Sequence, residues 1–151
     1  MKVYKLILII IWMVIIFMFS NQSATESSKV SDGLIDNTIV KIYELFNGKV
    51  SEENKEKIID NYTVIVRKSA HFVMYFILGV LCFVYFKDFT KHYIIYSILL
   101  CFLYAVSDEI HQMFSINRGP GVIDVLIDTF GGVTAIAILG RKIIYDYFKK
   151  A

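Results

Sequence analysis

Four apolar blocks dominate this 151-residue chain, and they limit what it can fold into. They cover residues 3–19, 70–86, 93–106 and 122–139. A helix needs roughly 20 residues to cross the hydrocarbon of a bilayer, so the third block spans only if its helix continues through the polar residues 107–112. Because 56% of its residues are hydrophobic, the chain is too apolar for a soluble domain of this size. We therefore predict an all-α integral membrane protein.

The blocks predict a single membrane domain over residues 1–151 with four transmembrane helices. The spans are expected at about residues 3–20, 69–87, 92–112 and 121–140, with an external segment at about 21–68. In that segment, apolar residues at helical spacing end at Asn47-Gly48, which predicts an amphipathic helix on the membrane surface or over the bundle. Ser51 is placed to cap the start of a second external helix.

Lysine and arginine in the short loops predict the orientation of the chain. Residues 1–5, 87–92 and 141–151 together hold seven lysines and one arginine, whereas the turn at 113–121 holds a single base, Arg118. By the positive-inside rule both termini are cytoplasmic and the segment 21–68 lies outside. The apolar run behind Lys2 and Lys5 also resembles a signal peptide. We expect the first helix to be retained, with its cleavage as the alternative.

Ionisable side chains gather where three of the predicted spans meet the outer surface. An ionisable group within a span is costly and is usually functional, so their coincidence at one depth predicts a site. Residues spaced by four share a helix face. Arg67, His71 and Tyr75 therefore lie on one face of the second span, and Asp124 and Asp128 lie on one face of the fourth. The candidate ligand-binding residues are Arg67, Lys68, His71, Tyr75, Gln112, Arg118, Asp124 and Asp128, and the candidate catalytic residues are Asp108, Glu109 and His111.

These residue types allow three kinds of chemistry. Carboxylates and imidazoles can bind a divalent metal, and they can also carry protons. Arg67, Lys68 and Arg118 could hold a phosphate, and lipid phosphates lie at this depth. The structural alternative is a closed salt-bridge network, with Arg67 and Lys68 on Asp124 and Asp128 and with His71 on Glu109. No motif for a nucleotide, haem, flavin or nucleic acid is visible, and the cysteines lie inside apolar blocks as buried hydrophobes.

Four stretches of the chain resemble the VanZ-like membrane family, in order and with family-like spacing. They are Phe19-Ser20-Asn21-Gln22; Arg67-Lys68-Ser69-Ala70-His71-Phe72 with Tyr75 and Leu78-Gly79; Tyr104-Ala105-Val106-Ser107-Asp108-Glu109-Ile110-His111-Gln112 with Phe114; and Arg118, Asp124-Val125, Asp128 and Gly131-Gly132. The resemblance implies a small multi-spanning protein of the bacterial cytoplasmic membrane. Its namesake is associated with resistance to teicoplanin, a lipid-tailed glycopeptide antibiotic.

Three functions follow as hypotheses. The first is binding of a lipid-linked cell-wall precursor, a lipoglycopeptide or a membrane lipid at the outer polar site, with low-level teicoplanin resistance as its consequence. The second is a membrane-embedded enzyme that acts on a lipid headgroup by acid–base or metal-dependent chemistry. The third is a proton-coupled transporter, which is disfavoured because no internal repeat is visible and the polar residues form no path inward.

Overall fold

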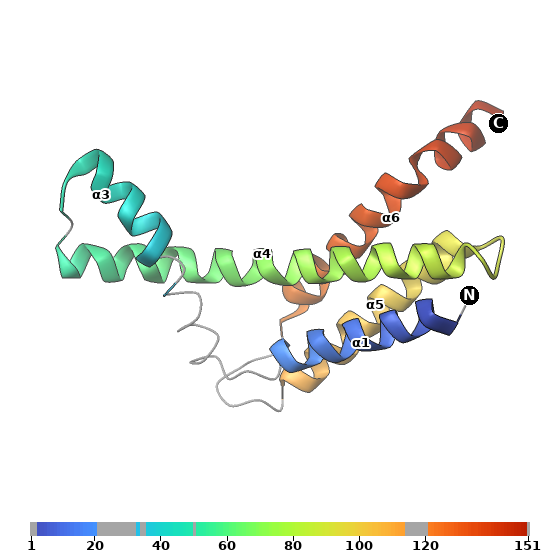
Figure 1. Cartoon of the computed structure of the whole chain (residues 1–151), viewed down its shortest axis with the longest axis horizontal. Coiled ribbons are helices and arrows are strands. Elements are labelled where there is room, and N and C mark those ends of the chain that lie inside the picture. The colour runs from blue at the N-terminus through green and yellow to red at the C-terminus, as the bar shows by residue number, and fades with distance from the viewer. Residues whose placement is uncertain (1–2, 21–32, 34–35, 50, 114–120, 151) are drawn as a thin grey trace.

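The computed structural model describes residues 3–20, 33, 36–49, 51–113 and 121–150, and every regular element in them is helical. Four helices are long and apolar enough to cross a membrane, namely α1 (Val3–Ser20), α4 (Glu52–Phe86), α5 (Tyr93–Gln112) and α6 (Val122–Lys150). A short π-helical turn, η1 (Asp36–Val40), leads into α3 (Lys41–Asn47). The predicted all-α, multi-pass class is therefore confirmed (Figure 1).

The longest helix, α4, differs from the prediction in its start. The external helix expected after Ser51 and the second span are one continuous helix from Glu52 to Phe86. Neither glycine nor proline occurs between residues 52 and 78, so the change from polar to apolar composition near residue 69 does not end the helix. Ser51 stands at the predicted N-cap position with an extended backbone, but its side chain makes no capping hydrogen bond.

The segment η1–α3 lies beside the N-terminal half of α4, which projects beyond the other long helices (Figure 1). Val40 is buried where η1 meets α4. As predicted, α3 ends at Asn47, and Gly48 follows with a φ of 82° and donates its N–H to the carbonyl of Glu44 at 2.9 Å. Leu45 and Phe46 are 82% and 84% exposed, so the apolar side of α3 faces away from the protein.

Glycines bring α6 into backbone contact with α4. A Cβ added to Gly79 of α4 would lie 2.5 Å from the carbonyl oxygen of Gly132, and one added to Gly131 would meet the carbonyl of Phe72. On its other side Gly132 faces Cys101 of α5, whose Sγ would lie 3.0 Å from an added Cβ. Small residues are the usual means by which membrane helices approach so closely. This packing sets the position of every polar side chain near the start of α6.

The first helix packs into the same bundle. Ile9 and Ile16 are buried, and the indole of Trp12 donates a hydrogen bond of 2.9 Å to the carbonyl of Met74 in α4. The hydroxyl of Tyr104 in α5 donates to the carbonyl of Met13 at 2.5 Å. These contacts make α1 part of the helix packing and carry its last residue to the polar end of α5.

Candidate polar site at the ends of the membrane helices

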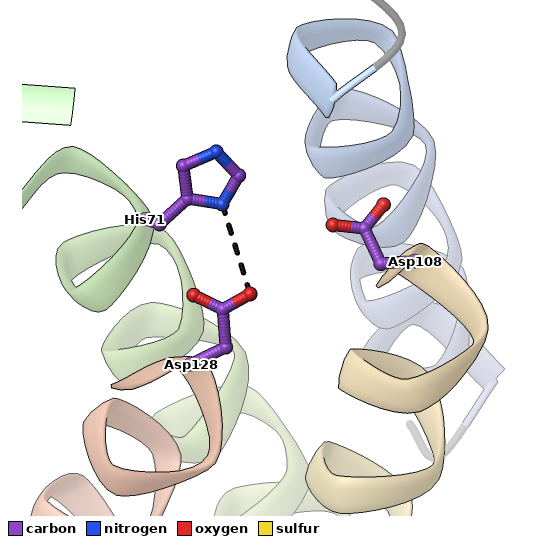
Figure 2. Close-up of side chains that lie close together, drawn as sticks. All are labelled: His71, Asp108 and Asp128. Carbon is purple, nitrogen blue, oxygen red and sulfur yellow. Dashed lines mark ion pairs between the residues drawn. The ribbon is translucent and has the colours of Figure 1, made fainter. Parts of the chain in front are cut away.

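Helices α1 and α5 end, and α6 begins, at one end of the bundle, where α4 passes them (Figure 1). We call this region the polar end of the bundle. At its centre lie His71 of α4, Asp108 of α5 and Asp128 of α6, with ligand-type atoms all within 4.8 Å of one another. Figure 2 shows His71 facing Asp128, with 3.7 Å between Nδ1 and Oδ2, and Asp108 across from both. Three helices thus bring one residue each to the acid–histidine cluster, which we define as His71, Asp108 and Asp128.

Both aspartates of the acid–histidine cluster are buried, each with only 3% of its surface exposed. The Oδ2 of Asp108 accepts a hydrogen bond of 3.1 Å from the amide of Gln112. The same amide nitrogen donates to the hydroxyl of Ser20 in α1 at 2.6 Å. Within the described part of the chain, Oδ1 of Asp108 and Oδ1 of Asp128 have no hydrogen-bond partner. Buried polar atoms are rarely left unsatisfied, so these two oxygens indicate a place where something else binds.

Tyr75 lies one helical turn beyond His71 on α4. Its side chain is fully buried, and its hydroxyl finds no hydrogen-bond partner among the described residues. It follows His71 by four residues, so the two side chains share one face of α4. As predicted from the i, i+4 spacing, Tyr75 therefore belongs to the same polar group as His71.

A second pair of charged residues lies nearer the surface. The Nζ of Lys68 in α4 is 2.6 Å from Oδ1 of Asp124 in α6, and both side chains are partly exposed. This is one of the ion pairs expected of a structural network. His71 faces Asp128, whereas the expected partner was Glu109. Arg67 is half-buried and forms no ion pair with any other described residue.

Glu109 has a contact that fixes helix α6 to helix α5. Its buried carboxylate accepts a hydrogen bond from the backbone N–H of Gly121, the residue before α6. A negative side chain at a helix N-terminus is favoured by the partial positive charge of the unpaired N–H groups. This contact gives Glu109, predicted as a proton carrier, a positioning role.

His111 lies on the side of α5 that meets α1. Its ring packs on Phe17 with 4.4 Å between the ring centroids, and it is not a member of the acid–histidine cluster. Arg118 lies outside the described residues. Ser20 was not predicted as a site residue, although it is fully buried and bonded to Gln112. Its signals in the sequence are a hydroxyl residue at the end of an otherwise apolar segment and its place in the stretch Phe19-Ser20-Asn21-Gln22 that resembles the family.

The fold and the site define a class: a small, multi-pass, all-helical membrane protein with a buried acid–histidine cluster shared by its helices. A family comparison agrees with the resemblance seen in the sequence. The model of the VanZ/LLP1 family matches residues 5–144, and the chain belongs to that family. No curated protein and no solved structure matches the chain.

Proposed function

We propose that this protein binds the headgroup of a membrane lipid, or of a lipid-linked envelope precursor, at the polar end of its bundle. The observation that carries the proposal is the convergence of polar side chains from four apolar helices, namely Ser20, His71, Asp108 and Asp128, at one depth. Ionisable groups inside membrane helices are costly to bury and tend to mark sites. A headgroup lies at this depth in a bilayer and can exchange polar contacts with these residues.

Two basic residues at the rim suit an anionic part of that ligand. Lys68 is held by Asp124, whereas the guanidinium of Arg67 has no ion-pair partner in the described residues. Arginine binds phosphate oxygens bidentately, which makes Arg67 the residue placed to contact a lipid phosphate. The lysine-rich loops orient the polar end toward the outside of the bacterial cytoplasmic membrane, with both termini in the cytoplasm. Family membership supports an envelope role there, and teicoplanin, which carries a lipid tail, is a natural second ligand.

Native mass spectrometry of the purified full chain tests the binding step. The probes are undecaprenyl phosphate and phosphatidylglycerol, and the variants are Arg67→Gln and Lys57→Gln. Lys57 is a matched control because it pairs with Glu53 and precedes Arg67 by ten residues on the same helix, about 15 Å along its axis. We expect the wild type and Lys57→Gln to retain an anionic lipid that Arg67→Gln loses. Equal retention by all three proteins would contradict the proposal.

Susceptibility measurements test the consequence for glycopeptides. The wild type and the same two variants are expressed at equal levels in a glycopeptide-sensitive Gram-positive host. If the effect depends on the lipid tail, the wild type should change the susceptibility of the host to teicoplanin and not to vancomycin. Arg67→Gln should lose this change, and Lys57→Gln should keep it. If the wild type produces no teicoplanin shift, the resistance role is rejected while lipid binding is still judged by the mass spectrometry.

A second candidate function is an enzyme that transforms the bound headgroup. The observation that favours it is the pair of buried carboxylate oxygens without hydrogen-bond partners beside His71, since a positioned carboxyl or imidazole can carry a proton. Thin-layer chromatography of labelled lipids after incubation with the protein measures turnover. Enzymatic action predicts a product with the wild type and none with Asp108→Asn, whereas simple binding predicts no product with either.

A further inference from the structure

We propose that His71, Asp108 and Asp128 bind one divalent first-row metal ion, such as Zn²⁺ or Mn²⁺. The proposal goes beyond lipid binding and stands without it. It begins from the position of three side chains on three different helices (Figure 2). All three possess ligand atoms that such ions accept, because imidazole and carboxylate groups both bind zinc and manganese.

The distances agree with a shared ion. Ligand atoms bonded to zinc at about 2.0–2.2 Å in a tetrahedron lie roughly 3.4 Å apart. In the structure His71 Nδ1 and Asp128 Oδ2 are 3.7 Å apart, and the atoms of the whole cluster lie within 4.8 Å of one another. Asp108 lies across from the other two residues, so a shared ion requires the three ligand atoms to draw together from separations of up to 4.8 Å (Figure 2).

The unsatisfied oxygens point to a ligand independently of those distances. Oδ1 of Asp108 and Oδ1 of Asp128 are buried without a hydrogen-bond donor from the described residues, and each of the two residues is only 3% exposed. The buried hydroxyl of Tyr75, one helical turn from His71 on α4, also lacks a hydrogen-bond partner among the described residues. A metal ion satisfies carboxylate oxygens directly, and a water molecule bound to that ion can hydrogen-bond the tyrosine hydroxyl.

The local charge also calls for a cation. Two buried carboxylates face one imidazole, and no lysine or arginine of the described segments forms an ion pair with either of them. Lys68, the nearest basic residue along α4, is bonded to Asp124. Carboxylates that share a low-dielectric site must take up a proton or a cation, and a divalent ion neutralises both at once. The competing explanation, a proton held between the acids, predicts no metal.

The surroundings resemble the outer shell of a metal site. Gln112 holds Asp108 through Oδ2 and is itself held by Ser20 of α1. Such outer hydrogen bonds orient ligands and raise metal affinity. The glycine contacts of α4 with α6 bring the helices that carry His71 and Asp128 close together. Three protein ligands leave a coordination position open, where a water molecule or a ligand oxygen can bind.

Metal titration of the full chain tests the site directly. Tag-free protein in lipid nanodiscs is stripped with a chelator and titrated with ZnCl₂ or MnCl₂ alone, followed by calorimetry and elemental analysis. The variants are Asp128→Asn and Asp124→Asn, which make the same nearly isosteric change one helical turn apart on α6. We expect the wild type to bind one ion per chain and Asp124→Asn to bind it with unchanged affinity. Asp128→Asn should lose at least about tenfold in affinity, because even the loss of an outer partner of a metal site costs that much.

Two results would overturn the metal site: a wild type that takes up no stoichiometric ion, or an Asp124→Asn variant weakened as much as Asp128→Asn. Circular dichroism shows whether each variant is folded, and Asp108→Asn replaces Asp128→Asn if the latter is not. Metal should also raise the unfolding temperature of the wild type and leave that of the ligand variant unchanged, because binding stabilises only the folded state. The titration measures metal uptake and the mass spectrometry measures lipid retention, so a failure of the metal site and a failure of lipid binding are separate results.

Discussion

Gln112 connects two helices with one amide nitrogen, which donates to Ser20 of α1 and to Asp108 within α5. Replacement by leucine keeps most of the volume and leaves both acceptors buried without this donor. We expect Gln112→Leu to lower the free energy of unfolding by about 1–3 kcal/mol, the usual cost of unsatisfied buried polar groups. Reversible unfolding in mixed micelles measures it. Ser107→Ala, on the exposed face of the same helix, should change stability by less than about 0.5 kcal/mol.

The ion pair of Lys68 with Asp124 should contribute little to stability. Its side chains are partly exposed, and such pairs contribute roughly 0.2–1 kcal/mol. A double-mutant cycle with Lys68→Gln, Asp124→Asn and the double variant isolates the coupling energy in mixed micelles. The coupling should shrink as salt is added, because exposed charges are screened. A coupling well above 1 kcal/mol would show instead that the pair is shielded from water.

Sequence spacing predicted which residues share the site better than it predicted their roles. The i, i+4 spacing placed His71 with Tyr75 and drew Asp128 into the bundle, as the structure has them. The same reasoning could not tell that Glu109 holds the backbone of Gly121, because that contact depends on how α5 and α6 are joined. For the closed salt-bridge network it paired His71 with Glu109, whereas the structure pairs it with Asp128, because the partner depends on how closely α4 and α6 approach.

Among the helices, the close approach of α4 and α6 depends on glycine at the contact. A methyl group at Gly79 would overlap the backbone of Gly132, which no side-chain rotation can relieve. We expect Gly79→Ala to destabilise the protein by about 1–3 kcal/mol, the range for overpacked cores, when unfolding is measured in mixed micelles. Gly33→Ala is the comparison, because nothing lies within 4 Å of an added Cβ there and stability should not fall. Equal stability of both variants would mean that the helices are not packed this closely.

Helix boundaries were harder to predict than the membrane spans themselves. Hydrophobicity marks the part of a helix that fits the bilayer, and it located all four long helices. It does not mark where the helix ends, so α4 was divided near residue 69 although no breaker occurs there. Where a breaker is present the boundary was right, as Gly48 after α3 demonstrates. The polar residues 107–112 continue α5 as predicted, since the apolar part alone is too short to span.

For the whole molecule, the connectivity of the helices brings the polar groups together. Helices α1, α4, α5 and α6 alternate in direction across the membrane if each spans it once, so the end of α5 and the start of α6 fall on one side. At about 1.5 Å per residue, the 35 residues of α4 extend for roughly 52 Å, well beyond the hydrocarbon core of about 30 Å. The part of α4 before Arg67 therefore has to project from the membrane on the side of the polar end.

That geometry predicts which engineered thiols are accessible from outside the cell. Ser51, before α4, and His92, in the turn before α5, are both exposed and lie at opposite ends of the bundle. Because the two native cysteines, Cys82 and Cys101, are fully buried, they should not react with a membrane-impermeant maleimide. We expect Ser51→Cys to be labelled on intact cells and His92→Cys only after the membrane is permeabilised. The reverse pattern would place the polar end in the cytoplasm, and an extracellular ligand such as teicoplanin could then not reach the acid–histidine cluster from outside.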